Sequence, residues 1–192
     1  MIGEALRAIR LTLVFAVVTG LVYSLVLTGA FQLVFPSQAN GSLITVNGQV
    51  VGSQLIGQEF KSDRYFHGRV SSTSPAYAAD NSAGSNLGPN NKALIDRVAS
   101  SARAVRAANG MGQNDPVPVD LVTADFSGFD PDITEASALL QVHRVAQARG
   151  LDESRVRALV EKYVHGRILW IFGEPYVNVL EVNLALDRGE AG

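Results

Sequence analysis

The sequence predicts an α/β protein that consists of a single N-terminal transmembrane helix followed by one mixed α/β extracytoplasmic domain. The first observation is a long apolar run from Leu11 to Phe35 that contains no charged residue. The second is the stretch after Pro36, in which β-branched runs with turn residues alternate with segments of helical periodicity. Such an alternation is typical of helices packed on a sheet.

The apolar run is long enough to cross a bilayer as a helix. Each helical residue rises about 1.5 Å, so roughly 20 apolar residues span a hydrocarbon core of about 30 Å. A cleaved signal peptide is the competing interpretation, with Arg7 and Arg10 as its basic region and Thr28-Gly29-Ala30 as its cleavage site. Because signal-peptide apolar regions are about 7–15 residues long, the length favours an uncleaved anchor.

The flanking charges predict the orientation of this helix. Arg7 and Arg10 precede it, and the next basic residue is Lys61. Since positive flanks stay in the cytoplasm, we expect residues 1–10 to be cytoplasmic, 11–35 to span the plasma membrane and 36–192 to be extracytoplasmic.

Small residues recur at intervals of four within the span. Such a stripe lets a second helix approach closely, although small residues are also common in membrane helices in general. The residues of this predicted partner-helix stripe are Thr12, Ala16, Gly20, Ser24 and Thr28.

Composition excludes several classes of function. The net charge of −2 and the pI near 5.9, without a basic stripe, argue against binding of nucleic acid. The absence of cysteine excludes disulfides, thiol catalysis and cysteine metal sites. The three histidines lie far apart in the sequence, so we expect no metal site.

Turn and cap residues predict the elements of the domain. Asn47-Gly48 between two β-branched runs predicts a hairpin of residues 43–46 and 49–51. Further strands are expected at 65–69, 117–122 and 176–184, and helices at 91–109, 133–149 and 152–166. The expected N-caps are Asp132, with Glu135 at capping-box spacing, and Asp152; Gly110 and Gly150 are the expected helix stops.

The residues alone indicate little catalytic chemistry. Ser85 is misplaced for a Gly-x-Ser-x-Gly nucleophile elbow, and the phosphate-binding P-loop pattern is absent. A membrane-anchored hydrolase that uses Ser85 or Ser127 is one alternative, and a secreted binding domain is another. Asp125, Asp130 and Asp132 form a candidate cation cluster, but turn and cap roles explain two of the three.

Several segments in a fixed order resemble one family. They are Tyr65-Phe66-His67-Gly68-Arg69, Gly84-Ser85-Asn86-Leu87-Gly88-Pro89-Asn90, Asp120-Leu121-Val122-Thr123-Ala124, Ser127-Gly128-x-Asp130-Pro131, Arg144-Val145-Ala146-x-Ala148-Arg149-Gly150 and Gly173-Glu174-Pro175-x-Val177-Asn178-Val179-Leu180. With the N-terminal span, this set resembles the C subunit of the bacterial Kdp potassium-transporting ATPase. The chain departs from the family pattern at Val70, Asp125, Phe126, Phe129, Asp132, Tyr163 and Tyr176.

The resemblance implies an accessory, non-transporting subunit without catalytic residues or a cofactor of its own. Its partners would be a channel-like subunit that carries potassium and a P-type subunit that hydrolyses ATP. It would stabilise the complex and raise the apparent ATP affinity of the catalytic subunit. The nucleotide region that the resemblance implies comprises Ser127, Gly128, Asp130 and Gln141. An extracytoplasmic domain conflicts with direct binding of cytoplasmic ATP, so we expect it to act near the potassium entrance.

Overall fold

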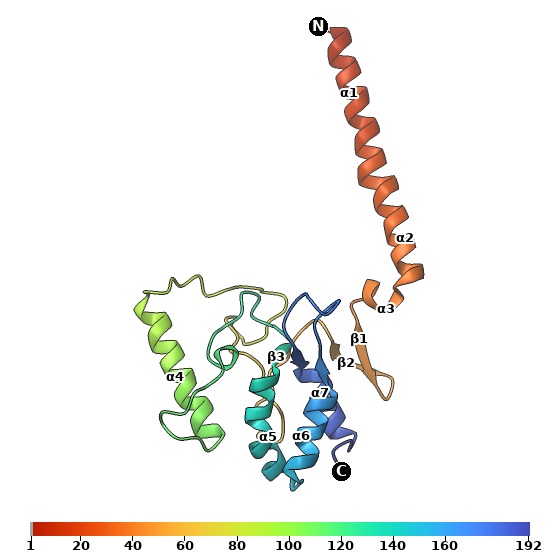
Figure 1. The fold of residues 1–192 in the computed structure, drawn as a ribbon. Helices are drawn as coiled ribbons and strands as arrows, with labels where there is room; N and C mark the ends of the chain where they lie inside the picture. Colours follow the sequence, from red (N-terminus) through yellow and green to blue (C-terminus); the bar gives the residue numbers. More distant parts are fainter. Residues whose placement is uncertain (1) are drawn as a thin grey trace. The chain divides into compact units, whose positions relative to one another are not determined.

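The computed structural model describes residues 2–192, and these divide into two units, one up to Val50 and one from Val51 to Gly192. The first unit begins with a continuous helical stretch, drawn in red and orange in Figure 1. It comprises α1 (Ile2–Val17), a π-helical segment η1 (Val18–Tyr23) and α2 (Ser24–Val34).

This stretch, Ile2–Val34, is long and apolar enough to cross a membrane, and none of its most apolar part is buried within the protein. Helical backbone therefore extends over nearly all of the predicted span. Hydroxyl groups of the span bond to preceding carbonyl oxygens, as in Thr19 Oγ1 to Phe15 O at 2.6 Å. The helix ends at Phe35, whose backbone leaves the helical region, and the short α3 (Pro36–Ala39) follows.

The predicted hairpin is confirmed as β1 (Leu43–Val46) and β2 (Gln49–Ser53), which pair with each other. Asn47 and Gly48 at its turn have φ values of 52° and 79°. Both values lie in the left-handed region that a type I′ turn requires, which explains why Asn-Gly occupies this turn.

The second unit contains a small antiparallel sheet with the order β3 (Asp132–Thr134), β5 (Tyr176–Asn178) and β4 (Val164–His165). Val177 at its centre is fully buried and pairs with Ile133 on one side and Val164 on the other. Because the central strand comes last in the sequence, the sheet joins segments that are far apart in the chain.

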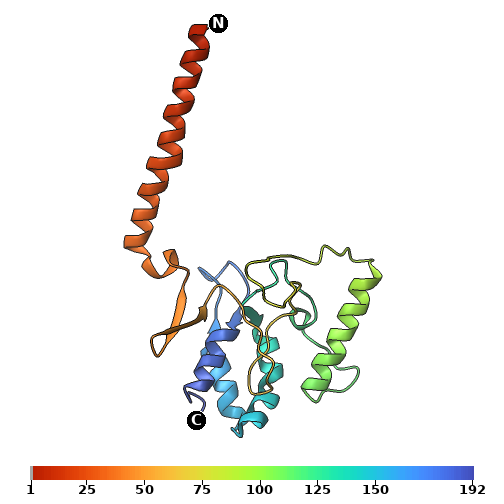
Figure 2. The same cartoon turned by 180° about the vertical axis from the view of Figure 1, so that it is seen from behind.

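Three helices supply most of the core: α5 (Glu135–Arg149), α6 (Glu153–Lys162) and α7 (Val179–Asp187). They lie together near the sheet in both views (Figures 1 and 2). Their inward residues, including Val145, Val160 and Val182, are fully buried. Hydrophobic burial of this kind provides the main stabilisation of the domain.

A fourth long helix, α4 (Lys92–Ala108), stands apart from the α5–α7 group in both views and has no buried residue. The predicted helix is confirmed, and the Asn91 side chain caps it by accepting a hydrogen bond from Ala93 N. Irregular chain connects α4 to the rest of the domain. The sequence thus predicted the element correctly.

Other predicted elements were wrong. Val119–Leu121 forms a short 3₁₀ helix, η2, instead of a strand, and residues 65–69 form no strand. The last predicted strand is limited to β5, because Asn178 caps α7 by accepting from Glu181 N. Asp132 lies in β3 and is not a cap; Thr134 caps α5 instead.

The remaining cap predictions fared better. Asp152 caps α6, which ends at Lys162 rather than Gly166. Gly150, with φ of 68°, ends α5 in the left-handed conformation. Both residues provide a local hydrogen-bonding or conformational property that the sequence alone identifies.

Candidate functional site

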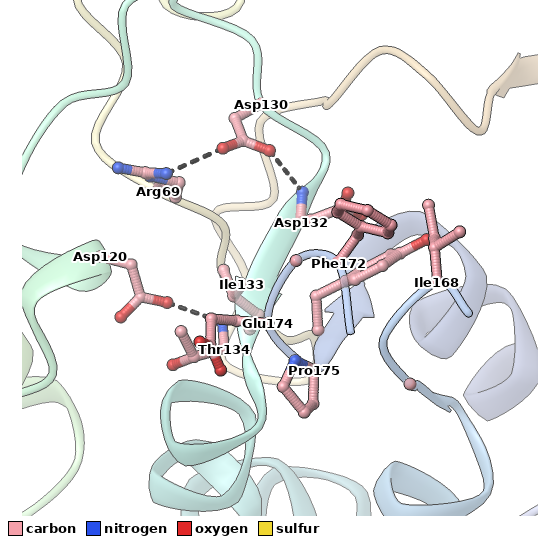
Figure 3. A pocket seen from close by; sticks show the side chains of 13 residues that line it. Arg69, Asp120, Asp130, Asp132, Ile133, Thr134, Ile168, Phe172, Glu174 and Pro175 are labelled. Carbon is pink, nitrogen blue, oxygen red and sulfur yellow. Dashed lines mark hydrogen bonds and ion pairs between the residues drawn. The ribbon is translucent and has the colours of Figure 1, made fainter. Parts of the chain in front are cut away.

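A cavity of about 340 Å³ lies beside the sheet (Figure 3). Arg69 comes to it from the irregular chain, Asp130 and Asp132 from the segment that enters β3, and Glu174 from the segment that enters β5. With Asp120, which also lines the cavity, four of the six family segments therefore meet at one place. The remaining wall includes Ile168 and Phe172.

The cavity wall includes an ion pair between Arg69 and Asp130, with Nη1 2.9 Å from Oδ2. The second carboxylate oxygen of Asp130 accepts a hydrogen bond from Asp132 N at 3.0 Å (Figure 3). The Arg69 backbone is also fixed, because its carbonyl accepts from the Tyr77 hydroxyl at 2.7 Å. Burial raises the pKa of Tyr77, so this hydroxyl remains a donor at neutral pH.

Asp132 is a carboxyl group of the cavity whose pKa is raised by its surroundings. Burial, with a smaller contribution from the neighbouring Asp130 charge, raises its pKa to about 6. Asn178 Nδ2 donates to its Oδ1 at 2.9 Å, and the nearby His165 also favours the charged form. Asp132 therefore changes charge nearer to neutral pH than an ordinary aspartate does.

The predicted nucleotide region is a turn whose backbone amides are already occupied. Asp125 Oδ2 accepts hydrogen bonds from Gly128 N at 2.8 Å and Asp130 N at 3.1 Å, and also from the Ser127 hydroxyl. Successive amides of this kind can bind an anion. In this protein the Asp125 carboxylate takes that position, so a phosphate would have to displace it.

The turn has no room for a side chain at position 128, which is occupied by glycine. Gly128 has a φ of 84°, and a Cβ at this position would lie 2.3 Å from Thr73 Cγ2. The Ser71 hydroxyl donates to the Gly128 carbonyl at 2.6 Å. The turn is thus packed against the chain around residues 71–73.

Gln141 does not point toward this turn but holds the segment around His67. Its Oε1 accepts from His67 N at 2.8 Å, and its Nε2 donates to His67 O at 3.0 Å. Ser137 O and Arg144 Nη2 complete its hydrogen bonds. Because both amide hydrogens are used, Gln141 has a structural role, and a contact with nucleotide stays a prediction.

Asn183 holds the adjacent residue in the same way. Its Oδ1 accepts from Phe66 N at 2.8 Å, and its Nδ2 donates to Phe66 O at 3.0 Å. Two side-chain amides therefore satisfy the backbone where the sequence predicted strand pairing. The fully buried ring of Phe66 anchors the segment in the core.

The segment Gly84–Asn90 is irregular and leads into α4, and Asn86 has a φ of 51°. Gly84 packs against the ring of Phe126, which lies 2.7 Å from the position of a Cβ on Gly84. The backbone amide of the cap residue Asn91 donates to Gly88 O at 3.0 Å. Ser85, Pro89 and Asn90 belong to the same connection, whose Gly84 end lies next to Phe126 of the Asp125–Asp130 turn.

The histidines contact groups other than the two candidate nucleophiles. His67 Nε2 contacts Ser62 O, His143 pairs with Glu153, and His165 pairs with Glu181. The Ser127 hydroxyl donates to Asp125. Among residues 2–192, no group of three or more metal-ligating side chains is close enough to hold an ion.

The stripe residues Thr12, Ala16, Gly20, Ser24 and Thr28 lie in the first unit, on the exposed helical stretch. A side chain built on Gly20 would meet no protein atom within 4 Å. The stripe is thus open to a partner, and its use as a contact stays a prediction.

Sequence reasoning missed an exposed apolar turn at residues 168–172. Its members are Ile168, Leu169, Trp170, Ile171 and Phe172, each at least 62% exposed. The available signal was the run of five large apolar residues between Gly166 and Gly173, which is too short for a buried helix and lies next to Arg167.

Within residues 2–192, the fold and the cavity define a class: a polypeptide with one apolar helix long enough to span a membrane and an α/β domain whose cavity contains an ion pair between Arg69 and Asp130. The family model for KdpC, described as the c chain of the K⁺-transporting ATPase, matches residues 5–188. The chain therefore belongs to the KdpC family.

Curated relatives agree with this family over the whole chain. The KdpC subunit of a potassium-transporting ATPase from Bradyrhizobium diazoefficiens is 51% identical over 203 residues, covering 100% of both chains. That of Rhodopseudomonas palustris is 51% identical, covering 99% of this chain and 100% of the relative. That of Sorangium cellulosum is 53% identical, covering 97% and 98%.

Proposed function

We propose that this chain is the accessory, non-transporting subunit of an ATP-driven potassium uptake pump, stabilising the complex without catalytic residues of its own. The observation that carries the proposal is the single family match from residue 5 to 188, which includes both the apolar helix and the domain. The relatives are named as subunits, so the proposed partners are a channel-like potassium-carrying subunit and an ATP-hydrolysing P-type subunit.

The membrane span is proposed to contact a partner helix through the small-residue stripe. Gly20 lies in the stripe and Gly29 outside it, and a side chain at either position meets no atom of this chain within 4 Å. Gly20→Leu should therefore lower co-purification of the partners in mild detergent, because it blocks close helix approach. Gly29→Leu is the matched control, and equal assembly of both variants would remove the stripe from the proposal.

The domain is proposed to lie outside the cytoplasm, near the potassium entrance. The support is the position of Arg7 and Arg10 before the span and the lack of basic residues after it until Lys61. Protease added to intact spheroplasts should digest residues 36–192 and leave the span. Protection of the domain until the membrane is opened would contradict this orientation.

The subunit is proposed to raise the apparent ATP affinity of the P-type subunit without binding nucleotide itself. Occupation of the turn amides by Asp125 and of the Gln141 amide by His67 supports an indirect effect. Partner subunits reconstituted without this chain should need more ATP for half-maximal hydrolysis. Photo-crosslinking of an azido-ATP to this chain in the intact complex would overturn the indirect mechanism.

A further inference from the structure

The most exposed apolar surface of the domain is the turn 168–172, here called the apolar loop. Trp170 at its tip is the only tryptophan of the chain and is 92% exposed, while Leu169 and Ile171 are 73% and 71% exposed. Contiguous exposed apolar side chains of this size mark an interaction site rather than ordinary surface. Tryptophan is also enriched among residues that dominate binding energy.

The loop has a defined conformation. Ile168 and Phe172 exchange two backbone hydrogen bonds, each 2.9 Å long. Leu169 and Trp170 have φ values of 52° and 67°, a conformation that is unfavourable for residues with a Cβ. Arg167 Nη2 donates to both carboxylate oxygens of Glu174, at 2.9 and 2.7 Å, across the base of the loop. The fold thus holds Trp170 away from the core at a local energetic cost, as is common at functional sites.

The charges beside the loop indicate what kind of surface covers it. Ile168 and Phe172 lie at the cavity of Figure 3, which is lined by one guanidinium, Arg69, and by four carboxylates. These acidic groups are Asp120, Asp130, Asp132 and Glu174. Membrane-binding loops and helices carry basic flanks that attract anionic lipids. Here the flanking Arg167 is neutralised by its ion pair with Glu174, and the other carboxylates of the cavity outnumber Arg69, which works against such binding. A protein surface with basic side chains beside an apolar recess complements both features.

We propose that the apolar loop is a docking element that inserts Trp170 into an apolar recess on another subunit of the pump, with a basic side chain of that subunit beside the acidic cavity. This inference rests on the proposed function, since it requires that the chain assembles with other subunits. The contact would have the usual anatomy of an interface, with an aromatic anchor at the centre and polar groups around it.

The absence of cysteine in this chain permits a direct test. Leu169→Cys and Ile171→Cys, which both leave Trp170 in place, are each labelled with maleimide-polyethylene glycol and read as a mass shift of this subunit's band. Labelling is compared between the full chain alone in detergent, the full chain alone in liposomes and the intact complex. Gln113→Cys, at an exposed position in the connection after α4, is the matched control.

Docking predicts that both loop cysteines react about tenfold more slowly in the complex than in the chain alone, while Gln113→Cys reacts equally in both. Trp170→Ser should also lower the retained fraction of partner subunits severalfold, and Trp170→Phe should restore most of it. Equal labelling of the loop cysteines in a complex that co-purifies would overturn the docking element and leave the proposed function intact. If the loop cysteines of the chain alone are protected from labelling in liposomes, the loop contacts lipid instead and the docking proposal is wrong. If the wild-type chain co-purifies with no partner subunit, the proposed function itself is overturned.

Discussion

Asp132→Asn should make the domain more stable at neutral pH. The folded protein has a pKa of about 6 at Asp132 against an ordinary value of 3.8, because burial and the Asp130 charge disfavour the ionised form. The native state therefore holds this proton more tightly than the unfolded chain. The contribution of Asp132 to the free energy of unfolding is therefore largest below pH 3.8 and is lost as the pH rises to about 6.

The difference between the two pKa values corresponds to at most about 3 kcal/mol. Asp132 is only partly buried, so solvent screening reduces the expected gain to about 1–2 kcal/mol at pH 7.5. Asparagine retains an oxygen that can accept the hydrogen bond from Asn178 Nδ2. The gain should therefore grow as the pH rises from about 4 to 6 and be complete above about pH 6, and it should vanish below about pH 4, where the wild-type carboxyl group is protonated in both states.

Urea unfolding of the full chain in detergent micelles, followed by far-ultraviolet circular dichroism, measures this difference. Asp80→Asn is the control, since it removes the same charge from an exposed position. Equal stability of wild type and Asp132→Asn at pH 7.5, or a gain that grows toward pH 4, would refute the assignment of a partly buried carboxylate destabilised by desolvation and by the Asp130 charge.

Other predictions concern the groups that hold the irregular chain. Gln141→Ala should lower the free energy of unfolding by about 2–4 kcal/mol, because it leaves the His67 amide and carbonyl without partners. The control Gln147→Ala, on the exposed side of α5, should change the free energy of unfolding by less than about 0.5 kcal/mol. Gly128→Ala combines a φ of 84° with a contact against Thr73 and should cost about 2–4 kcal/mol in the same assay. Gly150→Ala has a similar φ of 68° in open space and should cost about 1–2 kcal/mol, so equal losses for the two variants would show that the contact with Thr73 is unimportant.

The elements that the sequence predicted well are those fixed by local chemistry. Asn47-Gly48 at the hairpin, Asn91 and Asp152 at helix starts and Gly150 at a helix end each act on neighbouring backbone groups. The chain within a few residues supplies the full physical reason for each. The apolar span is likewise identified by its own length and composition.

The elements that were wrong depend on distant residues or on competing local signals. Residues 65–69 have strand-like composition, yet their backbone is bonded by Gln141 and Asn183, which are more than seventy residues away in sequence. Val179 and Val182 favour a strand by type, but Asn178 begins a helix three residues before Glu181. That Asn-x-x-Glu spacing is a cap signal that was present in the sequence.

The candidate site was predictable only in part. The family segments identified Arg69, Asp130 and Glu174, but their meeting at one cavity follows from the long-range order of the sheet. The hydrogen bonds from the amides of Gly128 and Asp130 to the Asp125 carboxylate lie within one short turn. An aspartate shortly before Ser-Gly is a recognisable sequence signal for such a turn. The exposure of Trp170 could not be read from hydrophobicity, which alone favours burial.

The π-helical segment Val18–Tyr23 has a geometric consequence for the span. On an α-helix with 3.6 residues per turn, positions four apart advance by about 40° at each step, so five such positions wind about 160° around the axis. A π segment holds more residues in each turn, because its hydrogen bonds reach one residue farther back, and it rotates everything beyond it in the opposite sense. This rotation brings Ser24 and Thr28 back to the helix face that carries Thr12 and Ala16. A nearly straight neighbouring helix could therefore contact both ends of the small-residue stripe.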